Sequence, residues 1–149
     1  MSGEPASHAG STAEYDVVVQ RDVGVAMADG ATLFADVYVP TRDGEPPRGE
    51  LPVLLERSPY DKGRLAHTVT GEFFAERGYV YVVQDVRGRY SSDGEFQFLR
   101  HEADDGEATM HWLAAQPWCG QIGTLGISYT TATQQALAVR HPPKLATQA

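Results

Sequence analysis

Hydrophobic and polar residues alternate along the first part of the chain, a pattern typical of β-strands. Residues 15–40 are rich in β-branched side chains, and an Asp29-Gly30 pair, a common turn signal, interrupts them. Apolar residues then fall on every second position at Leu33, Ala35, Val37 and Val39. The pattern predicts a meander of two or three antiparallel strands, followed by a polar surface loop at residues 41–50.

Short apolar runs and helical stretches alternate in the rest of the chain. Continuous apolar runs with the length of buried strands occupy residues 51–56, 79–84 and 122–127. Helical stretches occupy residues 71–77, residues 102–116 and a segment from Ser128 to the Pro142-Pro143 pair. Strands that alternate with helices indicate right-handed crossovers and a parallel sheet. The sequence therefore predicts an α/β fold in which a β-meander precedes a βαβαβα unit.

The helix predicted at residues 102–116 is amphipathic and begins with acidic residues, which the helix dipole favours there. Its predicted apolar face consists of Ala108, His111, Trp112 and Ala115. We expect the nearby acids to form a solvated surface and helix N-terminal charge: Asp93, Glu95, Glu102, Asp104, Asp105 and Glu107. We expect the following residues in the core: Phe73, Phe74, Trp112, Trp118 and Cys119.

The composition is that of an ordinary soluble globular protein. The 149 residues carry a formal net charge of −8, 42% of them are hydrophobic, and Cys119 is the single cysteine. The length fits one domain of about 100–200 residues. A single cysteine excludes an internal disulfide framework and a cysteine-based metal cluster. The acidic charge argues against a general nucleic-acid-binding protein, which needs a basic face.

Nothing in the sequence predicts a membrane segment or a secretory signal. No apolar run approaches the ~18–20 residues that a membrane-spanning helix needs. Residues 1–14 lack the basic and apolar regions of a secretory signal, so we expect them to be a disordered polar leader. We therefore expect a cytoplasmic protein with neither membrane nor nucleic-acid partners. The sequence does not predict its oligomeric state.

The segment LGISYT, residues 125–130, carries the most chemical information. A buried strand is predicted to end near Gly126, Ser128 sits at the turn, and a helix begins at once. In a nucleophile elbow, such a turn lifts the serine hydroxyl above the sheet and points helix N–H groups at it. Gly126 would let the strand and the helix pack closely, although Thr130 breaks the strict G-x-S-x-G pattern. The alternative is that Ser128 only caps the helix.

Four stretches together resemble the N-terminal part of the X-prolyl dipeptidyl aminopeptidase and cocaine esterase family of α/β-hydrolases. In chain order they are residues 27–40 (MADGATLFADVYVP), 57–62 (RSPYDK), 84–96 (QDVRGRYSSDGEF), and WLAAQPWC with GTLGISY within residues 112–129. The resemblance implies the N-terminal portion of an α/β-hydrolase fold with a nucleophile elbow. We expect residues 15–149 to form the first part of such a catalytic domain, truncated after the nucleophile helix.

The resemblance also implies roles for individual residues. Ser128 matches the nucleophile, and Tyr129 would supply a backbone N–H to the oxyanion hole. Tyr60 matches a tyrosine whose hydroxyl is the second donor, the alternative being a turn residue packed on Pro59. The family needs no metal and no organic cofactor, and it acts on small-molecule esters or amides. We interpret Asp85 as architectural, either capping backbone N–H groups or pairing with Arg87.

The sequence departs from the family pattern in its elbow and in its triad. Thr131 stands where the family has glycine, and residues 118–123 are one residue shorter than its loop. In α/β-hydrolases the acid and the histidine follow the serine, yet no Asp or Glu follows Ser128. His141 is predicted on the nucleophile helix, too far along it to act as base. His67, His101 and His111 precede the serine, contrary to the order of the fold.

The resemblance therefore predicts a serine hydrolase whose triad acid and histidine are missing from this chain. The sheet is expected to stop at the strand before Ser128, leaving an apolar edge without a neighbour, and residues 144–149 to approach a further strand. One alternative is a catalytically inactive hydrolase fragment or a non-enzymatic interaction protein. A flavodoxin-like binding domain is disfavoured, because no phosphate-binding glycine loop follows the first parallel strand.

Overall fold

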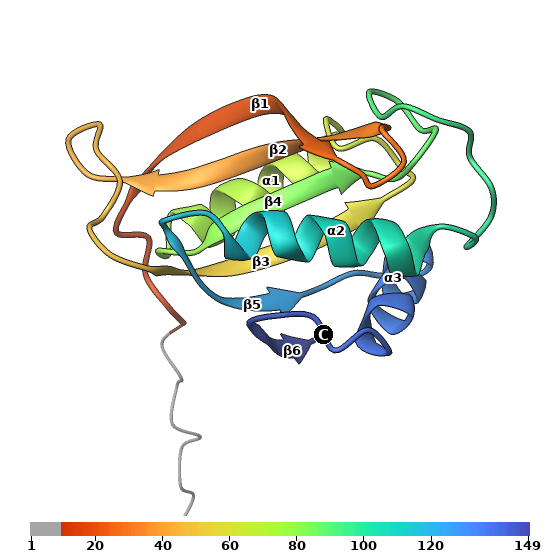
Figure 1. The fold of residues 1–149 in the computed structure, drawn as a ribbon. Helices are drawn as coiled ribbons and strands as arrows, with labels where there is room; N and C mark the ends of the chain where they lie inside the picture. Colours follow the sequence, from red (N-terminus) through yellow and green to blue (C-terminus); the bar gives the residue numbers. More distant parts are fainter. Residues whose placement is uncertain (1–9) are drawn as a thin grey trace, which may run out of the picture.

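A computed structural model describes residues 10–149, in which one mixed sheet of six strands lies between three helices (Figure 1). The strands are β1 (Asp16–Ala26), β2 (Thr32–Thr41), β3 (Leu51–Ser58), β4 (Val80–Asp85), β5 (Cys119–Thr124) and β6 (Leu145–Gln148). Their order across the sheet is β1-β2-β4-β3-β5-β6. β1, β2 and β4 pair antiparallel, whereas β4, β3, β5 and β6 are parallel. The predicted α/β fold is confirmed.

The predicted meander is a hairpin of two long strands, β1 and β2. The Met27 N–H donates to the Ala31 carbonyl at 2.8 Å, and Gly30 has the positive φ of 89° that closes the turn. The register shifts between Gln20 and Val23, where Asp22 bulges with a φ of 52°. Leu33, Ala35 and Val37 are fully buried, as their alternation predicts.

The helices cover both faces of the sheet. α1 (Leu65–Ala75) lies behind the sheet in Figure 1, and α2 (Glu102–Ala114) lies in front of it. α3 (Tyr129–Ala138) packs against α2 on the front side. The larger core cluster joins Met110 of α2 and Leu137 of α3 to the sheet, and a smaller one joins Ala75 of α1 to Tyr38 and Tyr81. The sheet is therefore buried on both faces in its centre.

α1 begins six residues earlier than the stretch 71–77 that the sequence predicts as helical. Its buried side carries His67, Gly71 and Ala75 rather than large apolar residues. Gly71 is needed there, because a Cβ atom would lie 2.7 Å from the Tyr38 ring. Three of its apolar residues are exposed instead, Leu65, Val69 and Phe73, whereas Phe74 is half-buried and packs on Tyr81. The prediction that Phe73 lies in the core is therefore wrong, whereas Phe74 contacts the core as predicted.

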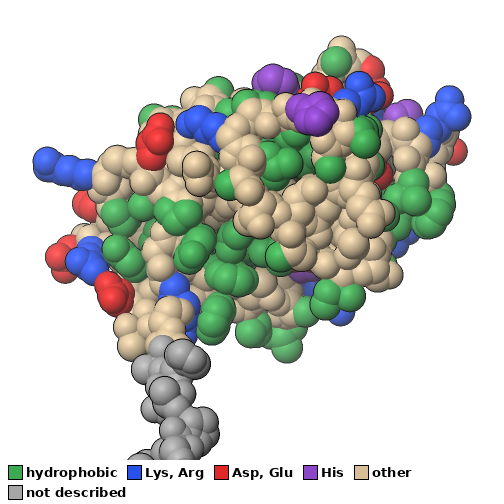
Figure 2. Space-filling model, turned by 90° about the horizontal axis from the view of Figure 1, so that it is seen from below, with side chains coloured by type: hydrophobic (Ala, Val, Ile, Leu, Met, Phe, Trp, Pro, Cys, Tyr) green, Lys and Arg blue, Asp and Glu red, His purple; other side chains and the backbone are tan. Residues whose placement is uncertain are grey.

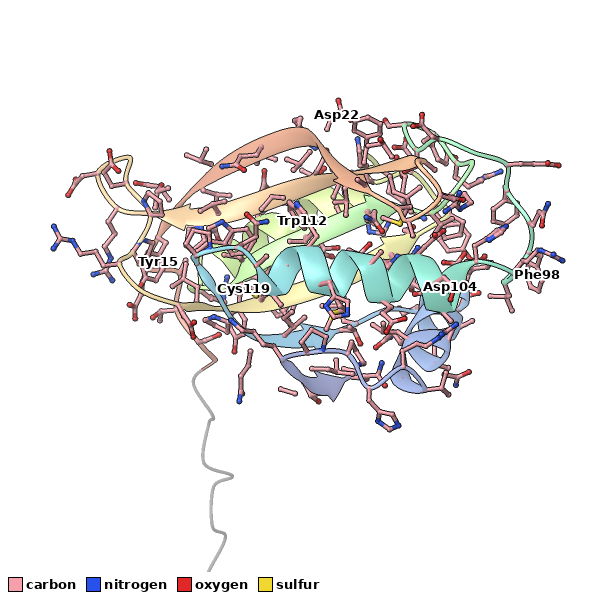
Figure 3. All side chains as sticks on the ribbon, viewed as in Figure 1. Tyr15, Asp22, Phe98, Asp104, Trp112 and Cys119 are labelled. Carbon is pink, nitrogen blue, oxygen red and sulfur yellow. The ribbon has the colours of Figure 1, made fainter. Side chains whose placement is uncertain are left out.

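α2 buries a different face from the predicted one. Thr109, Met110 and Leu113 are buried, whereas His111 and Ala115 are exposed. Trp112 is half-buried and lies over the sheet in Figure 3. The helix is turned by about one residue because the buried face begins with two acids, Glu102 and Asp105. The prediction that these two acids belong to a solvated surface is wrong.

The last part of the chain extends the sheet. β5 is Cys119–Thr124 rather than residues 122–127, and Cys119 is fully buried as predicted. α3 ends at Ala138, before the predicted stop at Pro142. β6 pairs parallel with β5, so the prediction that β5 has no neighbour is wrong. The apolar Leu145 packs against the core and makes this pairing favourable.

The remaining observations concern the surface. Residues 1–9 of the predicted leader lie outside the described part, and at its last residue the Glu14 N–H donates to the Glu76 carbonyl at 2.7 Å. No helix within residues 10–149 has the length and apolar character that crossing a membrane demands. Seen from below, the surface carries hydrophobic areas in the middle and most of its charged side chains at the margins (Figure 2).

Candidate active site

Ser128 lies in a sharp turn between β5 and α3, at the carboxyl end of the parallel strands. Its backbone has φ 63° and ψ −120°, a region that non-glycine residues rarely adopt. Helix-capping serines have an extended backbone and accept a helix N–H, but the Ser128 side chain makes no capping hydrogen bond. Ser128 is exposed. The turn therefore presents its hydroxyl outward rather than using it to cap the helix.

The turn depends on a close approach at Gly126. A Cβ atom at this position would lie 2.1 Å from Thr130 Oγ1 and 2.5 Å from Thr130 Cβ. Thr130 Oγ1 accepts the Ile127 N–H at 2.5 Å and donates to the Ile127 carbonyl at 2.8 Å. Thr131 Oγ1 donates to the Gly126 carbonyl at 2.9 Å. The two threonines that depart from the family pattern are thus part of the hydrogen bonding that holds the turn.

Tyr60 reaches Ser128 from the other side of the site. It lies in the turn after β3, and its Oη is 3.4 Å from Ser128 Oγ. The Tyr60 N–H donates to Ser58 Oγ at 3.0 Å, and the Arg64 guanidinium lies 5.9 Å from the Tyr60 ring centre. The structure therefore brings together two residues that are 68 positions apart in the sequence.

A pocket of about 400 Å³ opens beside these two hydroxyl groups. It lies between the first half of α1 and the turn before α3, and its volume is in the range of small-molecule sites. Its lining combines polar and apolar residues: Glu56, Tyr60, Arg64, Ala66, His67, Thr70, Leu125, Gly126, Ile127, Ser128 and Thr130. Ile127 is 84% exposed and lies directly before the serine. The pocket can therefore present a small molecule to Ser128.

The Tyr129 side chain points away from this pocket into a buried polar network. Its hydroxyl donates to Glu102 Oε1 at 2.7 Å, and Glu102 Oε2 accepts from Arg57 at 2.9 Å. Burial and the bond to Glu102 raise the pKa of Tyr129 to about 12. Arg57 also donates to Gln84 at 2.8 Å. This network fixes the first residue of α3, and sequence reasoning missed it because Glu102 reads as an ordinary helix N-terminal acid.

Asp85 holds the loops around the site, as the architectural interpretation predicts. Its carboxylate accepts the Lys62 N–H at 2.8 Å and the Ser91 N–H at 3.2 Å. Burial raises the pKa of Asp85, although these two bonds oppose the change. Arg87 pairs with Asp29 and Asp105 rather than with Asp85. Of the two alternatives for Asp85, the structure shows the backbone cap.

His67 lines the same pocket as Ser128, but its ring nitrogens face other residues. His67 Nε2 is 3.1 Å from Ser58 Oγ, and His141 lies beyond the end of α3. His101 and His111 line a separate pocket of about 410 Å³ beside α2. Among residues 10–149, no histidine hydrogen-bonds to Ser128, and no cluster of histidine, cysteine and acidic side chains suits a metal ion.

Comparison with known sequences identifies relatives. The sequence model of the X-Pro dipeptidyl-peptidase (S15 family) matches residues 29–149. Cocaine esterase from Rhodococcus sp. (strain MB1 Bresler) is 40% identical over 126 residues, which cover 81% of this chain and 21% of the esterase. The chain therefore spans about a fifth of the length of this curated relative.

Solved structures show the same fold. A CocE/NonD family hydrolase from Staphylococcus aureus matches with a TM-score of 0.75 and 28% identity, over 89% of this chain and 27% of that protein. An α-amino acid ester hydrolase matches with a TM-score of 0.73 and 28% identity, over 97% of this chain and 27% of that protein. By sequence and by fold, the chain belongs to the X-Pro dipeptidyl-peptidase (S15) family of α/β-hydrolases.

Proposed function

We propose that the protein carrying this chain is a serine hydrolase that cleaves ester or amide bonds of small molecules through an acyl-enzyme on Ser128. One observation carries the proposal. Ser128 holds a φ of 63° without capping its helix, while Tyr60 Oη lies 3.4 Å from its hydroxyl oxygen. A strained turn that exposes a serine hydroxyl to a pocket suits nucleophilic attack. The names of the relatives, an esterase and an ester hydrolase, support the ester as substrate.

The first half of the reaction forms the acyl-enzyme. Ser128 Oγ bonds to the substrate carbonyl carbon and gives its proton to a general base. The carbonyl oxygen becomes an oxyanion, which accepts hydrogen bonds from the Tyr60 hydroxyl and the Tyr129 N–H. The oxyanion then collapses, the bond to the leaving group breaks, and the departing alcohol or amine takes up the proton. Water attacks the acyl-enzyme in the same way and releases the carboxylic acid.

The general base and its acid are assigned to residues outside this chain. In this fold both follow the nucleophile in chain order. Within residues 10–149, His67 is already engaged by Ser58 and Glu56. A serine without its base is barely nucleophilic, so the chain alone is expected to be inactive. The non-enzymatic alternative predicts instead that the whole, folded protein is inactive as well.

The test is covalent labelling of the whole protein with a fluorophosphonate, which reacts with activated serines. The wild type is expected to label, and Ser128→Ala is expected to abolish the label. Ser91→Ala is the matched control, because Ser91 is an exposed serine of a neighbouring loop. Labelling that persists in Ser128→Ala, or a folded wild type that does not label, contradicts the proposal.

Removing the Tyr60 hydroxyl tests the oxyanion hole. One donor of this kind is worth about 10²–10³-fold in kcat. Tyr60→Phe is therefore expected to lower kcat for p-nitrophenyl acetate by about a hundredfold, with little change in KM. The matched control is Tyr90→Phe, since Tyr90 is an exposed loop tyrosine. An unchanged kcat in Tyr60→Phe contradicts the assignment.

A further inference from the structure

A serine, a histidine and a carboxylate lie in contact below the turn that carries Tyr60. His67 Nε2 is 3.1 Å from Ser58 Oγ, and His67 Nδ1 is 3.5 Å from Glu56 Oε2. Ser58 is fully buried, His67 is 6% exposed and Glu56 is 8% exposed. The order of the groups resembles a catalytic triad, but the oxygen of Ser58 cannot reach a substrate. The cluster therefore needs another explanation.

The direction of the hydrogen bonds follows from the chemistry of Glu56. Its carboxylate accepts a hydrogen bond from the Tyr81 hydroxyl at 2.7 Å, and the same oxygen lies 3.5 Å from His67 Nδ1. In the tautomer whose Nδ1–H faces this carboxylate, Nε2 accepts the hydrogen of the Ser58 hydroxyl. Ser58 Oγ in turn accepts the Tyr60 N–H at 3.0 Å. The His67–Ser58 and Tyr60–Ser58 hydrogen bonds then each have one donor and one acceptor.

The last bond of the series sets the start of the Tyr60 turn. Ser58 and Tyr60 flank Pro59, whose ring fixes one backbone dihedral, and a serine oxygen that accepts the N–H two residues later closes a tight turn. The far end of the same turn is anchored separately, because the Lys62 N–H donates to Asp85 at 2.8 Å. Tyr60 therefore stands between two fixed backbone points, and its side chain spans the pocket mouth to Ser128.

We propose that Glu56, His67 and Ser58 are positioning residues for the oxyanion hole. Glu56 contacts the His67 ring, and the His67–Ser58 hydrogen bond holds the Ser58 hydroxyl in one orientation. This orientation holds the Tyr60 N–H, and the turn so fixed aims the Tyr60 hydroxyl at Ser128. The proposal rests on the proposed serine hydrolase function and goes beyond it by giving the buried histidine a task. In this role none of the three residues gives up a proton during the reaction, although Glu56 and His67 also belong to the pocket lining.

A double-mutant cycle in the whole protein separates this role from a merely structural one. Ser58→Ala is expected to lower kcat for p-nitrophenyl acetate by about tenfold with little change in KM, because a small displacement of a catalytic group is costly. In a Tyr60→Phe background the same change is expected to alter kcat less than about twofold, because the group being positioned is already gone. Full additivity of the two losses overturns the proposal.

The histidine is tested in the same way, with a control from the next residue. His67→Leu is expected to lower kcat as Ser58→Ala does, and the two changes together no further. Thr68→Ala is the matched control on the same helix, since its hydroxyl donates to the Arg64 carbonyl within the helix, and it is expected to leave kcat unchanged. Equal losses in His67→Leu and Thr68→Ala overturn the proposal.

Hydrogen exchange of the Tyr60 amide measures its hydrogen bond to Ser58 independently of activity. Both Ser58→Ala and His67→Leu are expected to speed this exchange by about tenfold. The melting temperature of each variant serves as the control that it is still folded. Unchanged exchange in His67→Leu overturns the proposal. A fluorophosphonate label that persists in Ser128→Ala contradicts the proposed function instead, so the two failures are distinguishable.

Discussion

Tyr129 serves two parts of the molecule at once. Its backbone N–H stands at the start of α3 beside Ser128, while its buried hydroxyl bonds to Glu102 and accepts the Leu99 N–H at 3.2 Å. Tyr129→Phe leaves both groups short of a partner, and we expect a loss of about 2 kcal/mol in the free energy of unfolding at neutral pH. Urea unfolding measures it, with Tyr90→Phe as an exposed control that should change nothing.

The same hydroxyl predicts how this difference depends on pH. The pKa of Tyr129 is about 12 in the folded protein, against about 10 in an unfolded chain. The folded state therefore keeps a proton that the unfolded state releases, and its stabilisation falls as pH rises from 10 to 12. The gap in unfolding free energy between the wild type and Tyr129→Phe is expected to narrow over this range. A gap that widens contradicts the assignment.

Gly126 is the residue on which the geometry of the serine turn depends. A methyl group there would collide with both the side chain and the backbone of Thr130, whose carbonyl carbon would be 2.9 Å away. We expect Gly126→Ala to lower the unfolding free energy by about 1–3 kcal/mol and to slow fluorophosphonate labelling of Ser128. Gly10→Ala is the control, because a Cβ at position 10 meets nothing within 4 Å. Normal labelling in Gly126→Ala would show that the turn tolerates the added methyl group.

At the scale of elements, α2 is docked by a buried ion pair. Glu102 at its first residue and Arg57 of β3 are each 3% exposed in their side chains and 2.9 Å apart. Glu102→Ala leaves the Arg57 charge buried without this partner, and we expect a loss of about 3–5 kcal/mol in unfolding free energy. Asp104→Ala removes an exposed acid from the same helical turn and is expected to cost less than about 1 kcal/mol. Similar losses in the two variants contradict this account.

The elements that were predicted correctly are those whose pattern reflects burial. The alternation at Leu33, Ala35 and Val37 predicts β2, and the apolar run at residues 51–56 predicts most of β3. The sequence predicts too late a start for α1, because Leu65 and Val69 in its first half face outward and its buried side there carries His67. β5 was placed too late because Leu125 and Ile127 line the pocket instead of continuing the strand.

Only those residues of the candidate site that belong to a family motif could be predicted from the sequence. Ser128 and Tyr60 follow from the family's stretches, and the structure brings them within 3.4 Å of each other. The cluster of Ser58 and His67 has no such signal, because the two residues are nine positions apart across a turn and their contact depends on how α1 packs. The buried Glu102 was missed because an acid in the first turn of a helix usually needs no partner.

At the scale of the whole molecule, Lys62 joins the β1 bulge, β2 and the Tyr60 turn. Its Nζ lies 2.6 Å from Asp22 Oδ1 and 3.2 Å from Asp36 Oδ1. We expect Lys62→Met to lower the unfolding free energy by about 2 kcal/mol, because Arg21 still pairs with Asp36. Arg48→Met, at an exposed loop position, is the control in the same urea titration. Equal stability of the wild type and Lys62→Met contradicts this role.

The ion pairs of Lys62 also make the stability of the protein sensitive to acid. Hydrogen bonding to Lys62 lowers the pKa of Asp22 below its usual 3.8. The stabilisation by this pair is therefore present above pH 4 and is lost as pH falls through the lowered pKa. The difference in unfolding free energy between the wild type and Lys62→Met is expected to be smaller in strong acid than at pH 7.

The contacts of Tyr129 also determine when Ser128 becomes reactive as the protein folds. The residue after Ser128 is held by Glu102, which stands at the start of α2 and in turn holds Arg57 of β3. A newly made α3 therefore lacks its anchor until α2 has packed on the sheet. During refolding, Ser128 should accordingly become reactive at the rate at which α2 docks. The rate of labelling by a serine-reactive probe therefore measures this docking step.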